Sequence, residues 1–129
     1  MIVVTGAIGF IGSAFVSYLN QLGYYDIIVV DDFYQWKKEK NLKGKRVHDW
    51  VHRDLFISYF EKQASQIDIV FHLGARTDTV SEDTAVFNLL NLRYSKEIWR
   101  ICTAQSIPLV YASSAATYGD GSFGFKDSH

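Results

Sequence analysis

The sequence predicts an α/β fold, a Rossmann-type doubly wound parallel sheet with strand order 3-2-1-4-5. Three observations predict it. Short runs rich in Val and Ile alternate with segments of helical periodicity, which is typical of parallel strands buried on both faces. A glycine-rich turn, T-G-A-I-G-F-I-G from Thr5 to Gly12, directly follows the first run. An acidic pair, Asp31 and Asp32, ends the second.

The composition fits one domain. The chain has 129 residues, of which 48% are hydrophobic and 16% aromatic, enough to build a core. Its 13 basic and 14 acidic residues give a net charge of -1, which offers no support for binding nucleic acid or a membrane surface. The single cysteine, Cys102, excludes an internal disulfide and suits a reducing cytoplasm. The first apolar run has no basic leader and is too short for a signal peptide or a membrane span.

The first strand and its turn are predicted to bind a phosphate group. The strand covers residues 2–4, and Gly6, Gly9 and Gly12 follow it in a G-x-x-G-x-x-G pattern. Three glycines allow a tight bend, close approach of the backbone to a pyrophosphate, and close packing of helix on strand. The helix that begins there directs free N–H groups and its positive dipole end at the turn. The alternative is a glycine-rich turn that binds no nucleotide.

The next elements are a helix and a second buried strand. The helix starts at Gly9 and ends at Gly23, and its predicted sheet-facing residues are Ile11, Phe15, Tyr18, Leu19 and Leu22. The strand covers Ile27 to Val30 and ends in Asp31 and Asp32. A carboxylate at this place in the fold accepts hydrogen bonds from adenosine ribose hydroxyls. The alternative is that the pair caps a helix or a loop.

Residues 33–64 are predicted to hold a basic loop, a short strand and a helix. The loop is rich in lysine around Lys38, which could bind a 2′-phosphate and so favour NADP over NAD, or could be a solvated surface loop. The strand covers Arg46 to Val51, and the helix covers Asp54 to Ala64. His48 and His52 are predicted to be surface residues. The inward side of the helix is predicted to carry Leu55, Phe56, Tyr59 and Phe60.

The strand at Ile67 to Phe71 leads into a stretch suited to close contact with a ligand. This stretch is His72-Leu73-Gly74-Ala75-Arg76-Thr77, and its small residues would let a cofactor approach the backbone. Arg76 could bind a phosphate or form a salt bridge.

A helical pattern then runs from Ser81 to Gln105, in which one of Asn88 and Asn91, of which we prefer Asn91, is predicted to bond to the strand-end loops. The core residues predicted for this helix are Val86, Leu89, Leu90, Ile98, Ile101 and Cys102.

The last predicted strand, Ile107 to Ala112, delivers Ser113 and Ser114 to the same edge of the sheet as the other strand ends. Open α/β sheets bind ligands in the crevice at that edge. A serine hydroxyl there could orient a substrate alcohol, but it is not a base near neutral pH, so another group must accept the proton.

Four motifs in this order resemble the extended short-chain dehydrogenase/reductase family of nucleotide-sugar epimerases and dehydratases. They are T-G-A-I-G-F-I-G, D-D, H-L-G-A-R-T and Y-A-S-S-A-A-T-Y-G. The segments N-L-R-Y-S-K-E and I-P-L-V-Y-A-S-S-A-A-T-Y-G look most similar to the ADP-L-glycero-D-manno-heptose 6-epimerases within that family. The resemblance implies a homo-oligomeric cytoplasmic enzyme that acts on a nucleotide sugar such as ADP-heptose by transient oxidation with bound NADP.

The resemblance also implies roles for individual residues. Ser114 matches the family's catalytic serine or threonine, which works with the tyrosine and lysine of a Y-x-x-x-K motif. Asp31 and Asp32 would hold the adenosine ribose, and Lys38 and Arg53 would contact the adenine-side phosphate. The remaining cofactor-binding residues implied are Gly6, Gly9, Phe10, Ile11, Gly12, Leu73, Gly74, Ala75, Arg76 and Asn91.

The sequence departs from the family pattern in one respect. No Tyr-x-x-x-Lys follows Ser114, and the Tyr34 to Lys38 spacing lies in the predicted adenosine loop. We therefore expect residues 1–129 to be a truncated dinucleotide-binding domain without the C-terminal substrate domain, inactive alone, with apolar surface exposed and a tendency to associate. The alternatives are an NAD-dependent nucleotide-sugar dehydratase or 4-epimerase, and a nucleotide-binding module without catalysis.

Overall fold

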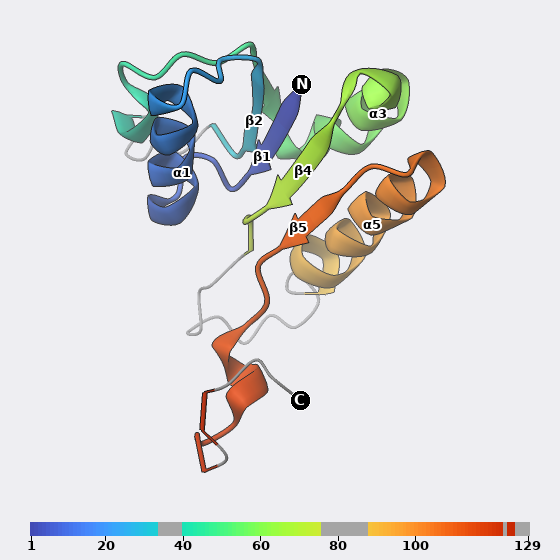
Figure 1. Cartoon of the computed structure of the whole chain (residues 1–129). Coiled ribbons are helices and arrows are strands. Elements are labelled where there is room, and N and C mark those ends of the chain that lie inside the picture. The colour runs from blue at the N-terminus through green and yellow to red at the C-terminus, as the bar shows by residue number, and fades with distance from the viewer. Residues whose placement is uncertain (34–39, 76–87, 123, 126–129) are drawn as a thin grey trace.

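A five-stranded sheet in the order β3-β2-β1-β4-β5 forms the centre of the computed structural model (Figure 1). The structure describes residues 1–33, 40–75, 88–122 and 124–125. Every pair of neighbouring strands is parallel, so the carboxyl ends of the strands share one edge. The predicted fold class and strand order are confirmed. The strands are β1 (Ile2–Thr5), β2 (Ile27–Asp31), β3 (Asp49–His52), β4 (Ile69–His72) and β5 (Leu109–Tyr111).

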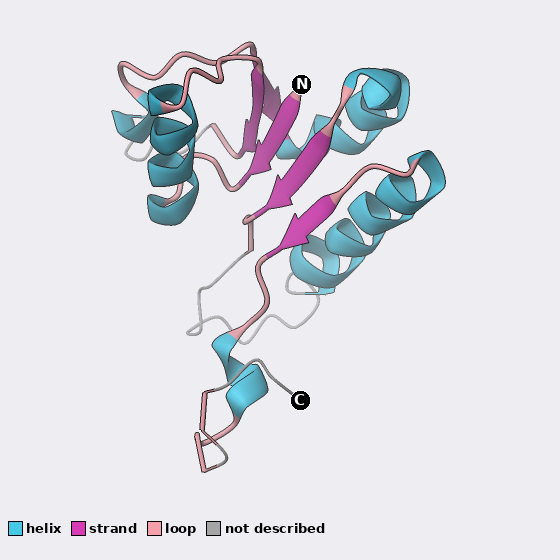
Figure 2. Cartoon of the chain, viewed as in Figure 1, coloured by secondary structure: helices cyan, strands magenta, loops and turns pink. Residues whose placement is uncertain are grey.

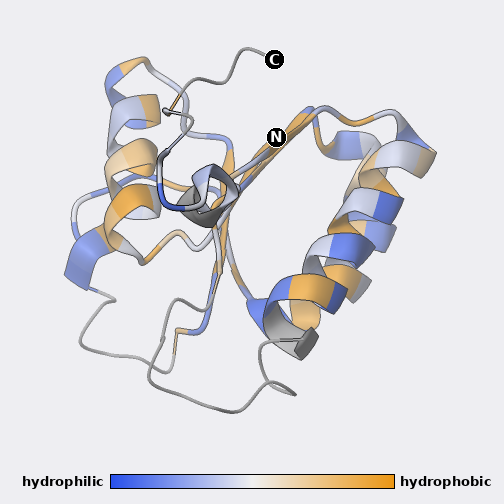
Figure 3. Cartoon of the chain, turned by 90° about the horizontal axis from the view of Figure 1, so that it is seen from below, coloured by the Kyte–Doolittle hydropathy of each residue, from blue (hydrophilic) through white to orange (hydrophobic). Residues whose placement is uncertain are grey.

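Helices cover both faces of the sheet (Figures 2 and 3). Helix α1 (Phe10–Gln21) lies on one face, and α3 (Arg53–Gln63) and α5 (Tyr94–Gln105) lie on the other. The predicted helix from Ser81 to Gln105 is described only from residue 88, where a π-helix, η3 (Asn88–Arg93), runs into α5. Short 3-10 turns complete the description: η1 (Lys40–Leu42), η2 (Ala64–Gln66) and η4 (Ala115–Tyr118).

Two apolar clusters fix the helices to the sheet. On β1, Val3 faces the cluster under α3 and α5, and Val4 faces the cluster under α1. This alternation places β-branched side chains on both faces of the central strand, as a buried parallel strand requires. The first cluster includes Phe56, Phe60, Val70, Ile98, Ile101 and Cys102, and the second includes Ile8, Val16, Leu19, Ile27, Val29 and Leu42.

The predicted inward face of α1 is partly wrong. Ile11, Tyr18 and Leu22 are exposed by 70%, 54% and 55%, whereas the buried positions include Gly12 and Val16. The cause is local, because Gly12 has no side chain and lets the helix backbone lie directly against the preceding turn. The helix therefore turns its Gly12 side to the sheet, and the larger apolar side chains beside it face outward. Leu55 of α3 was also predicted to face inward and is 66% exposed.

The predicted end of α1 at Gly23 is confirmed. Gly23 has a φ of +86°, and its amide donates to the carbonyl of Asn20 at 3.0 Å. The amide of Tyr24 donates to the carbonyl of Leu19 at 2.9 Å. This pair of bonds is the Schellman arrangement, which satisfies the last carbonyls of the helix and needs a residue that tolerates positive φ.

The β5 end of the sheet leaves apolar side chains in contact with solvent. Val110 and Tyr111 are exposed by 46% and 52%. A second apolar region is a hollow of about 730 Å³ at the amino ends of the strands, lined in part by Tyr24, Tyr25 and Phe71. Exposed apolar surface of this kind is the physical basis for the expected association. No helix in the described ranges is long and apolar enough to cross a membrane.

Candidate functional site

The glycine turn joins β1 to α1 at the carboxyl edge of the sheet. The amide of Gly6 donates to the carbonyl of Val30 at 2.8 Å, and the amide of Gly9 donates to the carbonyl of Gly6 at 3.1 Å. Gly9 is the N-cap of α1 and makes no side-chain cap bond. The amides of the first turn of α1 are therefore not capped by a side chain, which is the arrangement that binds anions at helix N-termini.

Backbone contacts explain why two of the turn positions are glycine. Gly6 has a φ of +69°, and a Cβ added there would lie 2.6 Å from the Cα of Gly74. A Cβ added at Gly12 would overlap the carbonyl oxygen of Gly6. Gly6 therefore makes the tight bend and also packs on the loop after β4, and Gly12 gives the close packing of helix on turn. At these glycine positions no side chain stands between the backbone and its surroundings.

Asp31 and Asp32 have different neighbours at the end of β2. Asp31 Oδ2 accepts a hydrogen bond from the amide of Ile8 at 3.0 Å, and Asp31 Oδ1 accepts one from the amide of Asp32 at 2.8 Å. Asp31 therefore braces the glycine turn, as the alternative of a loop cap predicted. The side chain of Asp32 is 17% exposed, and its Oδ2 lies 3.2 Å from Arg53 Nη2.

His52 was predicted to be a surface residue, and this prediction is wrong. Its side chain is 17% exposed, and its Nε2 lies 3.4 Å from Asp32 Oδ1. Its Nδ1 accepts a hydrogen bond from the amide of Asp54 at 3.3 Å, so the ring caps the start of α3. The sequence signal that could have identified this role is a polar residue directly before the helix. His48, in contrast, is exposed as predicted.

The loop after β4 lies beside the glycine turn. Gly74 donates its amide proton to Thr5 Oγ1 at 3.1 Å, which joins the ends of β1 and β4. Leu73 packs at the margin of the cluster under α1, and Ala75 is exposed. Asn91 is half-buried in η3. Lys38, predicted to bind a phosphate or to lie in a solvated loop, and Arg76, predicted to bind a phosphate or to form a salt bridge, lie outside the described residues.

Ser114 follows β5, three residues beyond its end at Tyr111. Its side chain is exposed, and its carbonyl accepts a hydrogen bond from Thr117 Oγ1 at 2.6 Å. Because β4 and β5 are parallel and in register at His72 and Tyr111, the Ser114 segment leaves the sheet at the same edge as the Gly74 loop. The sheet therefore brings the predicted glycines, acids and serine to one edge, as expected.

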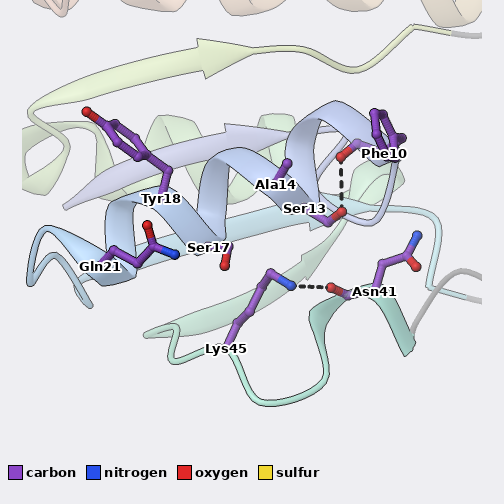
Figure 4. A pocket seen from close by; sticks show the side chains of 8 residues that line it. All are labelled: Phe10, Ser13, Ala14, Ser17, Tyr18, Gln21, Asn41 and Lys45. Atoms are coloured by element: carbon purple, nitrogen blue, oxygen red, sulfur yellow. Dashed lines mark hydrogen bonds between the residues drawn. The ribbon is translucent and has the colours of Figure 1, made fainter.

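A groove runs beside α1, starting at the first turn of the helix (Figure 4). It has a volume of about 480 Å³ and lies between α1 and η1. It shares Phe10 with the predicted site, and Phe10 is 88% exposed at the first position of α1. Within the described ranges, no cluster of three or more His, Cys, Asp or Glu residues could hold a metal ion. The groove is lined by Phe10, Ser13, Ala14, Ser17, Tyr18, Gln21, Asn41 and Lys45.

His72, at the end of β4, is a buried ionisable residue that the sequence analysis did not assign. It is 2% exposed, and burial lowers its pKa from 6.5 to about 4. The unfolded chain binds a proton below about pH 6.5 while the folded chain does not. Stability from this residue is therefore complete above about pH 6.5 and is lost as the pH falls toward about 4.

We expect the free energy of unfolding to fall by about 2.5 kcal/mol between about pH 7.5 and about pH 4.5 because of His72. Urea unfolding at the two pH values measures it. Carboxylates also titrate in this range, so the control is the variant His72→Asn, which keeps them and removes the imidazole. If the variant lost as much stability as the parent chain, His72 would not be the titrating group.

The chain matches known proteins over nearly its whole length. The family model described as the NAD dependent epimerase/dehydratase family matches residues 2–128. An ADP-L-glycero-D-manno-heptose-6-epimerase of Nitratidesulfovibrio vulgaris is 44% identical over 129 residues, covering 98% of this chain and 40% of that protein. The enzyme of the same name from Fusobacterium nucleatum is 39% identical over 98% of this chain and 39% of its own length. The chain thus spans about 40% of the length of these curated relatives.

Solved structures share the fold. A heptose 6-epimerase of Helicobacter pylori superposes with a TM-score of 0.74 at 24% identity, covering 92% of this chain and 40% of that chain. A UDP-glucuronic acid 4-epimerase of Bacillus cereus, solved with UDP-glucuronic acid and NAD, superposes with a TM-score of 0.76 at 26% identity, covering 98% and 44%.

Proposed function

The chain belongs to the NAD dependent epimerase/dehydratase family, and from this premise we propose that it is the cofactor-binding portion of a nucleotide-sugar epimerase of the ADP-L-glycero-D-manno-heptose 6-epimerase type. The observation that carries the proposal is the glycine turn, whose backbone leaves no room for a Cβ at Gly6 or Gly12 and which opens an uncapped helix. Relatives that are 44% and 39% identical to this chain bear this enzyme name. We place the enzyme in the cytoplasm as a homo-oligomer that takes a nucleotide sugar such as ADP-heptose.

We assign the pyrophosphate of the cofactor to the turn. Gly6, Gly9, Phe10, Ile11 and Gly12 would surround it, because the first-turn amides of α1 are donors without a side-chain cap. The exposure of Phe10 and Ile11, 88% and 70%, leaves both side chains accessible to a ligand. This accounts for two large apolar residues that the core does not use.

We assign the adenosine end to the group around Asp32. Its carboxylate is positioned by Arg53 and His52 at the end of β2, where it would accept hydrogen bonds from ribose hydroxyls. Asp31 would contribute indirectly by holding the glycine turn in place, since its oxygens accept hydrogen bonds from the amides of Ile8 and Asp32. Lys38 and Arg53 would bind a 2′-phosphate, which makes NADP our proposed cofactor and NAD the alternative.

We assign the remaining contacts to the loops after β4 and β5. The cofactor would be lined by Leu73, Gly74, Ala75 and Arg76, and Asn91 would support that loop. Ser114 would donate a hydrogen bond to the sugar hydroxyl that loses its proton, and in the family that the motifs resemble a tyrosine and a lysine take that proton. The bound nicotinamide supplies reversible hydride acceptance from the sugar carbon.

The test of cofactor binding is a thermal-shift titration of this chain with NADP, NAD, 2′,5′-ADP and 5′-AMP. A ligand present at about 100 times its Kd stabilises a protein by about 2.7 kcal/mol. We expect all four to raise the Tm, and the two 2′-phosphorylated ligands to do so at lower concentration. Equal responses with and without the 2′-phosphate would remove the role of Lys38 and Arg53. No response to any ligand would contradict the proposed function.

A related 4-epimerase activity is the second candidate. It is supported by the similarity to the UDP-glucuronic acid 4-epimerase, which superposes with a TM-score of 0.76 at 26% identity over 98% of this chain. Assays with ADP-heptose and with UDP-sugars separate the two. Turnover of UDP-sugars alone would favour the 4-epimerase.

A further inference from the structure

A chain of hydrogen bonds crosses the fold below the candidate site. Thr5 Oγ1 on β1 lies 2.6 Å from His72 Nδ1 on β4, and His72 Nε2 lies 2.8 Å from Ser95 Oγ on α5. Thr5 and His72 are each 2% exposed. The two strands are in register at these residues, so the contact is built into the pairing of β1 with β4.

The backbone fixes the direction of one bond in this network. The amide of Gly74 can only donate, and it donates to Thr5 Oγ1 at 3.1 Å. Thr5 Oγ1 accepts that bond, so its own hydroxyl proton can point to His72 Nδ1. In that arrangement Nδ1 is the acceptor, and Nε2 carries the ring proton and donates it to Ser95 Oγ. A neutral ring in this tautomer bonds to both neighbours, and it is the tautomer in which the Thr5 hydroxyl donates to the ring.

The network joins the pieces of the candidate cofactor site. Gly6 follows Thr5 directly, and its Cα lies so close to the Gly74 loop that a Cβ would come within 2.6 Å of Gly74 Cα. On the other side, Ser95 is the second residue of α5, which continues from η3, the segment that carries Asn91. His72 stands between these pieces, with Tyr111 stacked on its ring at a centroid distance of 5.6 Å.

We propose that His72 is a positioning residue for dinucleotide binding: its neutral ring orients the Thr5 hydroxyl that holds Gly74 beside Gly6, and ties both loops to α5 through Ser95. The proposal rests on the proposed function, since the ligand it concerns is the one assigned to the glycine turn. His72 itself is buried beneath the turn and acts on the cofactor through Thr5 and Gly74.

The test compares two variants of His72. His72→Asn places an amide near the position of Nδ1 and can still accept from Thr5, whereas His72→Phe keeps a ring and removes both bonds. We expect His72→Phe to weaken NADPH binding, measured by fluorescence titration, by about tenfold, the size of one lost hydrogen bond. We expect His72→Asn to recover most of that loss. A merely space-filling role predicts the opposite order, with the ring variant closer to the parent chain.

A second measurement does not depend on the cofactor. The ring nitrogens of His72 in the parent chain are examined by NMR, and the exchange of the Gly74 amide is measured in all three proteins. We expect a proton on Nε2 and none on Nδ1, and amide exchange that is faster by about tenfold in His72→Phe. A proton on Nδ1, or unchanged exchange in a folded His72→Phe, would overturn the inference. Loss of fold in His72→Phe leaves the tautomer and the Asn variant to decide it.

The two proposals fail in different ways. A parent chain that binds no dinucleotide would contradict the proposed function, and the NMR measurements would still decide whether His72 holds Gly74. A parent chain that binds NADPH, with His72→Phe binding equally well, would overturn the positioning role and leave the proposed function intact.

Discussion

Replacing Gly6 by alanine is expected to cost more than about 4 kcal/mol of folding free energy, the range that only a few kinds of point mutation reach. Two effects add at this position. The residue has a φ of +69°, where a Cβ is strained by about 1–2 kcal/mol. The Cβ would also lie 2.6 Å from Gly74 Cα and 2.7 Å from Gly74 N, and backbone atoms cannot rotate away as a side chain can.

The matched control for Gly6→Ala is Gly44→Ala. Gly44 has a similar φ of +78°, but nothing lies within 4 Å of a Cβ built there. We expect this variant to lose about 1–2 kcal/mol, from backbone strain alone. Urea unfolding followed by circular dichroism gives both values, and the difference isolates the contact between Gly6 and Gly74. Equal losses in the two variants would mean that the loops do not touch in solution.

The turn at Gly6 also shows how far sequence patterns can predict such a site. The strand, the glycine spacing and the following helix are local features, so the sequence predicted them and the structure confirms their positions. The glycine roles are partly non-local. Gly74 lies far along the chain from Gly6, and the spacing of the first three glycines carries no information about it. Only the sheet order, with β4 beside β1, brings the two together.

Histidine roles were harder to predict for the same reason. His72 has no local signal in the sequence, because its partners Thr5 and Ser95 come from other elements. His52 did have a local signal, its place before α3, but its approach to Asp32 depends on the pairing of β2 with β3. A sequence motif identifies which residues could bind a ligand. The pairing of strands decides which polar residues support them.

Helical periodicity has a different weakness: it finds the apolar residues of a helix but not the exact direction of its buried side. In α3 the pattern included Leu55, Phe56 and Phe60 alike. The structure buries Phe56 and Phe60 completely and leaves Leu55 66% exposed. Neighbouring positions on a helix differ by about 100° in direction, so Leu55 and Phe56 cannot both point to the sheet.

The replacement Phe56→Ala is therefore expected to destabilise the chain by about 3–5 kcal/mol. Phe56 is 0% exposed, stacks on Phe60 at a centroid distance of 5.2 Å, and belongs to the cluster that holds α3 and α5 against the sheet. The change removes a whole ring from a packed core, and the rigid strands below it limit how far the cavity can collapse. Urea unfolding measures the loss.

The control for Phe56→Ala is Leu55→Ala on the same helix. Alanine favours the helix at least as well as leucine, and the side chain removed is 66% exposed, so we expect a change within about 0.5 kcal/mol. The two residues are adjacent in sequence, but their exposed fractions are 66% for Leu55 and 0% for Phe56. Comparable losses in the two variants would mean that α3 is rotated about its axis relative to the arrangement described, and the capping of its first turn by His52 would then have to be reconsidered.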